Sequence, residues 1–587
     1  MNKYMKARYL EPLFLAGCVS CGLAATVLSS CSDKMDYKEY NIYGKDYIVE
    51  NFVNVGGFMT NLYNAVDYDF GNFSSGAMLA SASDESQYSK LGNGIEDFYN
   101  GAWSPSNAKE NLPSAWTKMY QAIATANEFL GNFQGETFEE LKHNTDYQAQ
   151  LHRYNNYQYE ARFMRAYYYF NLVKTYGGVP LIDRIMTPDE VNSLSRSSSD
   201  DIFQFIISEC DAIKDSIVVD YSDLGQYALT SEETGRADRL AVLALKARAA
   251  LYWASPLFNS SNDRERYHQA ALYTKQLLDE CELRGKGLAA NYSDLWSARA
   301  YNTASISKEI IFGRRYNSTS AGDHVVEGYN YPAGIEGGTG GNCPTQNLVD
   351  AYDMKNGKPI TDPTSGYDEA NPYDNRDPRL NASIAKNGDV WPSYQKNELQ
   401  TYEGGTNGEP LANATPTGYY LKKLCNGSIS LASNSTMKNA THTWLTFRVG
   451  EFWLNYAEAM FRYTGSATNT TSDLPVSALE AVNKTRRRAG VGDITDTDAA
   501  TFWTRYQKER MVELAFEGHR FWDVRRWKEA DLYFTNITEM KLTRNENGTI
   551  TYVRQNVSRQ WDNKMYLFPI PQTERLKNPN LEQNPGW

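Results

Sequence analysis

The sequence predicts a mainly α-helical fold, built from paired helices and interrupted by a long loop-rich insertion. Apolar residues recur three or four positions apart in several long segments, which is the spacing of helices with one buried face. Between about residues 290 and 445 this period disappears, and Gly, Asn, Asp, Thr and Pro dominate. A loop region of this length is usually functional or disordered, and its many aromatic residues argue against disorder. We therefore expect an ordered insertion with short strands and a few short helices.

The strongest helical segments follow one another in pairs. Residues 236–254 and 267–281 predict two antiparallel helices joined by a short loop, and further pairs are expected within 115–176 and 448–490. Gly177 to Pro180 should end one helix, because Gly caps a helix and Pro breaks it. These pairs resemble tetratricopeptide-type helical hairpins. We expect helical scaffold at about 51–66, 108–290 and 446–587, and loop-rich, ligand-facing regions at about 67–107 and 291–445.

The first 31 residues are typical of a lipoprotein leader. A basic start and an apolar stretch rich in small residues precede Leu28-Ser29-Ser30-Cys31. This tetrapeptide resembles a bacterial lipobox, in which the Cys thiol is acylated. A rival box ends at Cys18, but the apolar stretch before it is short. We expect a signal peptide at 1–30, lipidation of Cys31 and a tether over 31–50.

Charge and cysteine spacing argue against two classes of function. The net charge is -12, whereas a nucleic-acid-binding surface needs clustered Lys and Arg, so no nucleic-acid partner is expected. The cysteines beyond the leader are too widely spaced for a zinc or redox motif, although an envelope location would permit disulfides. These cysteines are Cys210, Cys281, Cys343 and Cys425.

Motifs for catalysis and cofactor binding are missing from the sequence. It contains neither a GxSxG serine nor an HExxH zinc motif, and its Gly-rich stretch at 334–341 fits no phosphate-binding spacing. Residues 67–72 hint at a calcium loop, but Met78 stands where the bidentate Glu should be. We therefore expect no cofactor, with an incidental structural calcium ion left open.

Several passages resemble the RagB/SusD family of outer-membrane lipoproteins. The most specific are ERMVELAFEGHRFWDVRRW (509–527), EARFMRAYYYFNLVKTYGGVPLI (160–182) and the closing YLFPIPQTERLKNPNLEQNPGW (566–587). The resemblance implies a single SusD-like domain over 51–587 that binds glycans without turning them over. It also implies a lipid anchor in the outer membrane, exposure at the cell surface, and a SusC-like TonB-dependent transporter as partner.

Residues 505–527 predict one amphipathic helix that belongs to the scaffold. Gly518 is unfavourable inside a helix, which indicates either a close backbone contact or a helix break there. Charged residues three positions apart are expected to pair along the helix. The expected pairs are Arg510 with Glu513, Glu517 with Arg520, and Asp523 with Arg526.

Three clusters of aromatic and polar residues in the loop-rich regions are candidates for glycan contact. Sugar faces stack on aromatic rings and sugar hydroxyls bond to polar side chains, so we look for exposed rings beside such groups. The clusters are Asp84, Glu85 and Tyr88 with Trp103; Tyr329 and Tyr331 beside the Gly-rich loop and Cys343; and Trp391 with Tyr394. Trp103 and Trp391 are the leading candidates, because turn-forming residues surround both. The alternative for each ring is that it packs a loop onto the scaffold.

Other functions stay open on the sequence alone. A RagB-like member would bind peptide instead of glycan, and a helical-repeat protein can act as a structural adaptor without a small ligand. A surface glycoside hydrolase would need two carboxylates flanking a sugar, and nothing in the sequence singles out such a pair.

Overall fold

The computed structural model describes residues 44–71, 73, 76–112, 115–221, 235–296, 303–316, 325–433, 435 and 442–587. The expected signal peptide, the rival box at Cys18, the lipidated Cys31 and most of the tether lie outside these residues. Lys45–Trp587 form one compact unit. No helix within the described ranges is long and apolar enough to cross a membrane.

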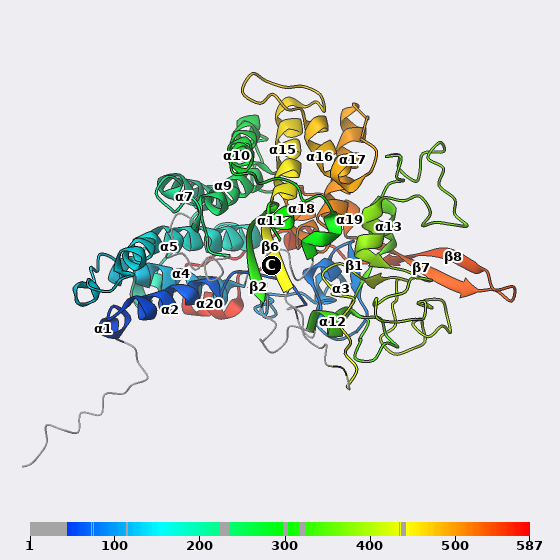
Figure 1. Ribbon diagram of the computed structural model, residues 1–587, viewed down its shortest axis with the longest axis horizontal. Helices are drawn as coiled ribbons and strands as arrows, with labels where there is room; N and C mark the ends of the chain where they lie inside the picture. Colours follow the sequence, from blue (N-terminus) through cyan, green and yellow to red (C-terminus); the bar gives the residue numbers. More distant parts are fainter. Residues whose placement is uncertain are drawn as a thin grey trace, which may run out of the picture. The chain divides into compact units, whose positions relative to one another are not determined.

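Helical hairpins make up one side of this unit, as Figure 1 shows. The expected pairs are present, and each helix packs against the next along the chain, so that the hairpins form a continuous stack. The paired helices are α4 (Trp116–Asn132) with α5 (Tyr147–Tyr176), α9 (Arg239–Ala254) with α10 (Arg264–Leu283), and α15 (Val449–Thr464) with α16 (Ala478–Ala489). Helices α2 (Phe52–Tyr63), α7 (Ser199–Ile213) and α17 (Ala499–Glu513) pack against this stack. The predicted mainly helical fold class is confirmed.

Two helices at the centre of the stack are buried on nearly all sides. In α5 every residue from Glu160 to Tyr176 except Arg162 is buried, and most of α9 is buried as well. A helix without an exposed face must pair the polar side chains it carries. Arg165 accordingly contacts Glu209 of α7 at 2.9 Å, and Arg248 forms an ion pair with Glu451 of α15. These contacts connect successive hairpins.

Among the described residues, four two-stranded antiparallel sheets join segments of the loop-rich regions and the C-terminal part. They pair β1 (Ser86–Tyr88) with β3 (Asn342–Pro344), β2 (Ile310–Tyr316) with β6 (His442–Arg448), β4 (Ile384–Ala385) with β5 (Tyr420–Leu421), and β7 (Asn536–Arg544) with β8 (Ile550–Ser558). The β1–β3 pair places Gln87 opposite Cys343, so it connects the two regions expected to face ligand. The β7–β8 hairpin lies within 446–587, which was expected to be helical, and it extends away from the helices (Figure 1).

Short helices connect these elements within the described residues. They are α1 (Lys45–Ile48), α3 (Asp97–Asn100), α6 (Pro188–Asn192), α11 (Ala304–Ser307), α12 (Val325–Asn330), α13 (Gln346–Ala351), α14 (Pro378–Ser383), α18 (Arg520–Arg526), α19 (Ala530–Tyr533) and α20 (Gln572–Lys577). Single 3-10 turns lie at η3 (Leu79–Ala82), η4 (Glu139–Leu141), η6 (Tyr292–Trp296) and η8 (Asn563–Tyr566).

The prediction of one helix over 505–527 is wrong, because the segment breaks in the middle. Helix α17 ends at Glu513, and α18 begins at Arg520. Phe516 and Gly518 between them have φ values of +59° and +77°. A Cβ added to Gly518 would meet the Trp444 ring at an ordinary 3.5 Å. Glycine is therefore favoured there by its left-handed backbone, and close contact with another backbone is not the reason.

Two of the three expected charge pairs in this segment are also wrong. Asp523 does pair with Arg526 at 2.8 Å, as predicted. The break separates Glu517 from Arg520, and Arg510 contacts Asp523 at 2.7 Å instead of Glu513. Glu513 and Glu517, which lack their predicted partners, are paired instead with buried cations from distant parts of the chain. Glu513 contacts Arg379, Arg448 and Arg488, while Glu517 contacts Lys423 and Arg448.

Candidate functional site

The first predicted cluster is buried. Asp84 accepts hydrogen bonds from two of the three Arg520 guanidinium nitrogens, Nε and Nη2, at 2.8 Å each. Trp103 is only 3% exposed. Its ring centroid lies 4.6 Å from those of Phe98 and Phe568 and 4.9 Å from that of Trp587. The expectation of an exposed ring at Trp103 is wrong, because the C-terminal tail covers it.

Glu85 in the same cluster is buried against the break that precedes α18. Its Oε1 accepts the Phe516 backbone N–H at 2.7 Å. Burial raises the pKa of Glu85 to about 8, against 4.5 for an ordinary Glu, despite that hydrogen bond. A carboxyl group that is buried and protonated contributes to the fold and is poorly placed to contact a ligand.

Glu85→Gln should flatten the dependence of stability on pH. The folded pKa lies above the unfolded one, so the contribution of Glu85 to stability is complete below about pH 4.5. It is lost as the pH rises through about 8, at up to about 1.4 kcal/mol per pH unit. The amide of the variant keeps an acceptor for the Phe516 N–H but does not titrate. Urea unfolding between pH 4.5 and 8.5 tests this, and parallel profiles for the two proteins would refute it.

The second and third predicted clusters come together in one aromatic group. The centroid of the Tyr331 ring lies 6.0 Å from that of Trp391 and 6.3 Å from that of Tyr394. Cys343 belongs to the same buried cluster. Tyr331 is fully buried and its hydroxyl contacts the Asn426 and Ile429 carbonyl oxygens. Trp391 is 5% exposed, so the expectation of an exposed ring is wrong for it as well.

Two of the predicted rings remain partly accessible. Tyr329 and Tyr394 are neither buried nor fully exposed. The Tyr329 ring packs so closely on Gly76 that a Cβ added there would lie 2.4 Å from the ring. Tyr88, which is buried, lies on β1 opposite Asn342 of β3. The structure therefore gathers residues of all three predicted clusters around β3, with Tyr329 and Tyr394 as the accessible members.

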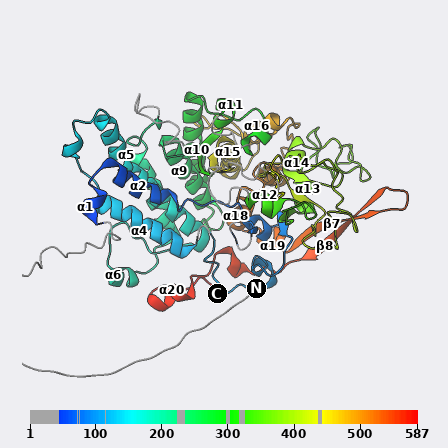
Figure 2. The same cartoon turned by 60° about the horizontal axis from the view of Figure 1, so that its bottom comes forward.

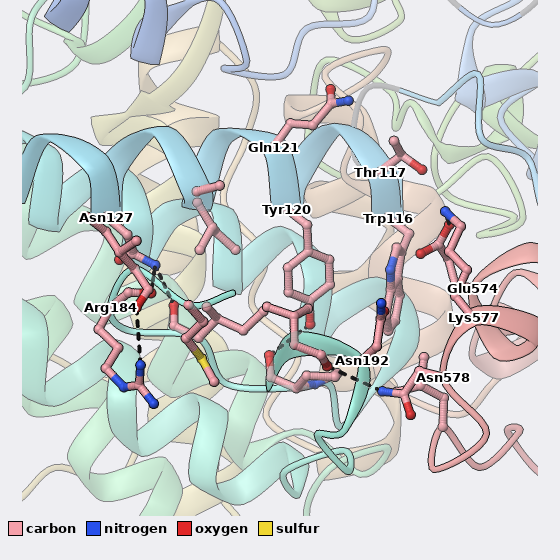
Figure 3. A pocket seen from close by; sticks show the side chains of 18 of the residues that line it. Trp116, Thr117, Tyr120, Gln121, Asn127, Arg184, Asn192, Glu574, Lys577 and Asn578 are labelled. Carbon is pink, nitrogen blue, oxygen red and sulfur yellow. Dashed lines mark hydrogen bonds and ion pairs between the residues drawn. The ribbon is translucent and has the colours of Figure 1, made fainter. Parts of the chain in front are cut away.

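A groove that the sequence did not indicate lies on the helical side of the molecule. It has a volume of about 470 Å³, within the range of small-molecule sites. Helix α4 forms one wall, the chain from Pro180 to Asn192 forms the second, and α20 with Asn578 and Leu581 forms the third. Figure 2 shows α4, α6 and α20 on the same side of the molecule. In Figure 3 Trp116 and Tyr120 project from one side of α4 into this space.

Hydrogen bonds hold two walls of the groove together. The Tyr120 hydroxyl donates to the Pro180 carbonyl at 2.8 Å, and the Asn127 amide donates to the Ile182 and Arg184 carbonyls at 2.9 and 3.2 Å. From sequence, Trp116 and Tyr120 belong to the helical pair predicted within 115–176. The opposing walls come from segments about 60 and 450 positions away, which helical periodicity cannot bring together.

Metal and thiol chemistry have little support in the described part of the chain. No three His, Cys, Asp or Glu side chains there are grouped so that they could hold a metal ion. The four cysteines beyond the leader are free thiols. Burial raises the pKa of Cys210 and Cys281, the latter to about 12, so both thiols stay protonated.

This helical fold matches that of solved SusD-like proteins. One solved SusD-like protein from Bacteroides fragilis aligns with 92% of this chain and 98% of its own, with a TM-score of 0.74 and 25% identity. Another from the same species, described as a SusD-like carbohydrate binding protein, covers 91% of this chain and 100% of its own, with a TM-score of 0.71 and 24% identity.

Sequence comparisons agree with the fold. The model of the SusD family matches residues 308–587, and a second one, described as starch-binding associating with outer membrane, matches residues 45–250. SusD-like protein P2 of Formosa agariphila is 24% identical over 491 residues, 80% of each chain. The chain belongs to the SusD/RagB family.

Proposed function

We propose that this protein captures oligosaccharides or polysaccharides at the cell surface and delivers them to a SusC-like TonB-dependent transporter in the outer membrane. The observation that carries the proposal is the match of two SusD-type family models to 45–250 and 308–587. The carbohydrate-binding description of one structural relative supports the ligand class. In this proposal the protein binds the glycan without cleaving it and is anchored by a lipid on Cys31.

The glycan contact is assigned to the loop face that carries Tyr329 and Tyr394. A partly exposed ring can stack on a sugar while its hydroxyl bonds to water or to the ligand. Tyr331, Trp391 and Cys343 form the buried base on which these loops rest. The role of the other predicted residues, Asp84, Glu85, Tyr88 and Trp103, is to hold the loop face on the scaffold.

Replacing either Tyr329 or Tyr394 with Ala should weaken glycan binding roughly two- to tenfold, because one stacking contact of about 0.5–1.5 kcal/mol is lost. Isothermal titration against a panel of plant, microbial and host polysaccharides measures this. Tyr463→Ala is the control, since Tyr463 is also partly buried but stacks on His268 at the helical side. The Tyr463→Ala variant should bind glycan with wild-type affinity.

Three outcomes would contradict these assignments separately. If the wild-type protein binds no polysaccharide of the panel, the proposed ligand class is wrong. If the two Ala variants bind as well as Tyr463→Ala, the site lies elsewhere. If bound glycan releases reducing ends, the protein is a hydrolase.

The anchor is tested with two cysteine variants in cells. Cys31→Ala should move the protein out of the outer-membrane fraction and abolish labelling by radioactive palmitate, whereas Cys18→Ala should change neither. The opposite pattern would move the lipid to Cys18. Uptake of a fluorescent oligosaccharide should fall in cells with Cys31→Ala, because the protein no longer stays at the transporter.

A further inference from the structure

We propose that the groove between α4, the Pro180–Asn192 segment and α20 is a second saccharide site, which binds one neutral sugar unit apart from the loop face. The ligand class rests on the proposed function. The location of the site rests on the groove alone.

The Trp116 indole N–H is a donor on the groove lining. Trp116 is 5% exposed and lines the groove. Its backbone N–H is satisfied separately by the Tyr176 hydroxyl at 3.0 Å. A ligand that covered this N–H without bonding to it would lose about 1–3 kcal/mol, so a favourable occupant brings an oxygen acceptor. A purely apolar occupant cannot do so.

The charged side chains around the groove are already paired with one another or with close neighbours. Arg184 contacts Glu190 at 3.1 Å, and Lys577 contacts Glu574 at 2.8 Å. Glu128 accepts the Asn132 amide at 2.6 Å. The lining carries two cationic side chains, Arg184 and Lys577, and two anionic ones, Glu128 and Glu574, so its net charge is zero and it favours neither sign of ligand. A neutral ligand fits this lining best.

The remaining surface suits a sugar ring. Tyr120 is partly exposed, and its ring lies 4.9 Å from that of Trp116, so the two form an aromatic wall. The side chains of Thr117, Gln121 and Asn192 also line the groove, and they are exposed and can exchange water for sugar hydroxyls. An aromatic wall beside neutral polar groups is the combination that saccharides require.

Hydrogen bonds also fix the second wall of the groove in place. The hydrogen bonds of Tyr120 and Asn127 hold the chain from Pro180 to Arg184 against α4. Asn127 Oδ1 in turn accepts from Arg165 at 2.8 Å. Because this wall is already ordered, less conformational entropy is lost on binding. This matters for a ligand as small as one sugar unit, which makes few contacts.

The test is isothermal titration of the purified mature protein with short neutral oligosaccharides, namely maltotriose, laminaritriose, cellotriose, xylotriose and mannotriose. Ala124 is exposed and lines the groove, so Ala124→Trp should fill the groove without disturbing the core. We expect wild-type protein to bind two equivalents and Ala124→Trp to bind one. Trp116→Phe keeps a ring but lacks the N–H, and should weaken the groove site roughly two- to tenfold.

The loop variants separate this inference from the proposed function. The double variant Tyr329→Ala, Tyr394→Ala should retain one site, and adding Ala124→Trp should abolish it. If Ala124→Trp leaves stoichiometry and affinity unchanged while the wild type binds saccharide, the groove is not a sugar site and the proposed function stands. If wild-type protein binds none of these probes or the polysaccharide panel, both fail. If a neutral peptide such as tetra-alanine binds, Ala124→Trp blocks it and no sugar does, the groove binds peptide.

Discussion

Arg448→Met is expected to lower the free energy of unfolding by about 3–5 kcal/mol, because it leaves buried carboxylates short of a counter-charge. The Arg448 guanidinium contacts Glu309 at 2.8 Å and both Glu513 and Glu517 at 2.7 Å. Burial by itself would raise the pKa of Glu513, but Arg488, Arg448 and Arg379 outweigh it and hold the pKa well below its usual value. Without Arg448, burial opposes the ionised form of Glu513 more strongly, and the pKa of Glu513 rises.

The matched control is Arg487→Met, which removes the same side chain from a solvent-exposed position. Arg487 contacts Glu480 and Asp493 at 2.7 and 2.6 Å, and its side chain is 48% exposed. Exposed pairs of this kind contribute at most about 1 kcal/mol. Urea unfolding, which adds no ions that screen charges, compares the two variants. Equal losses would show that the buried network contributes no more than a surface pair.

The helical scaffold could be predicted because its signal is local. In α4 and α5 the apolar residues recur at helical spacing, and Gly177 ends α5 as expected. The bounds differ mainly at the start of α5, which begins at Tyr147, ten positions before the clear apolar period at 157–176 that predicts the helix. Tyr147, Leu151 and Tyr154 do continue the helical spacing over this start, but polar residues such as Gln148 and Gln150 lie between them and weaken the signal.

The charge network could not be predicted, because its partners lie far apart in the sequence. Glu513 and Arg379 are 134 positions apart, and Asp84 and Arg520 are 436 positions apart. Local spacing suggested i,i+3 pairs instead, of which only Asp523–Arg526 exists. A buried carboxylate takes whichever cation the tertiary fold brings to it, and that choice has no local signal.

Ring exposure was the least predictable part of the candidate site. Turn-forming neighbours indicated surface loops around Trp103 and Trp391, and both residues do lie in loops. Whether a loop ring faces solvent depends on what covers it, and for Trp103 the cover is Phe568 and Trp587 at the far end of the chain. The groove was missed for the same reason, since α20 closes it from the C-terminal region.

Trp103→Ala is expected to lower the free energy of unfolding by about 3–5 kcal/mol, as for other buried aromatic residues replaced by Ala. The indole lies edge-on to three rings at 4.6–4.9 Å, those of Phe98, Phe568 and Trp587. Its removal leaves a cavity between the loop 67–107 and the C-terminal tail. Trp103→Phe keeps most of this packing and should be affected much less.

Trp103→Ala also separates a packing role from a ligand role. Because the ring is covered, the protein that remains folded should bind glycan with wild-type affinity when titration is done well below the unfolding temperature. Trp453→Ala is the control for stability, since Trp453 on α15 is only partly buried and lies 5.5 Å from the Lys484 ammonium. Trp453→Ala should lower the free energy of unfolding by less than Trp103→Ala does. A fully stable Trp103→Ala protein that binds glycan weakly would restore Trp103 as a ligand contact and would require the C-terminal tail to open on binding.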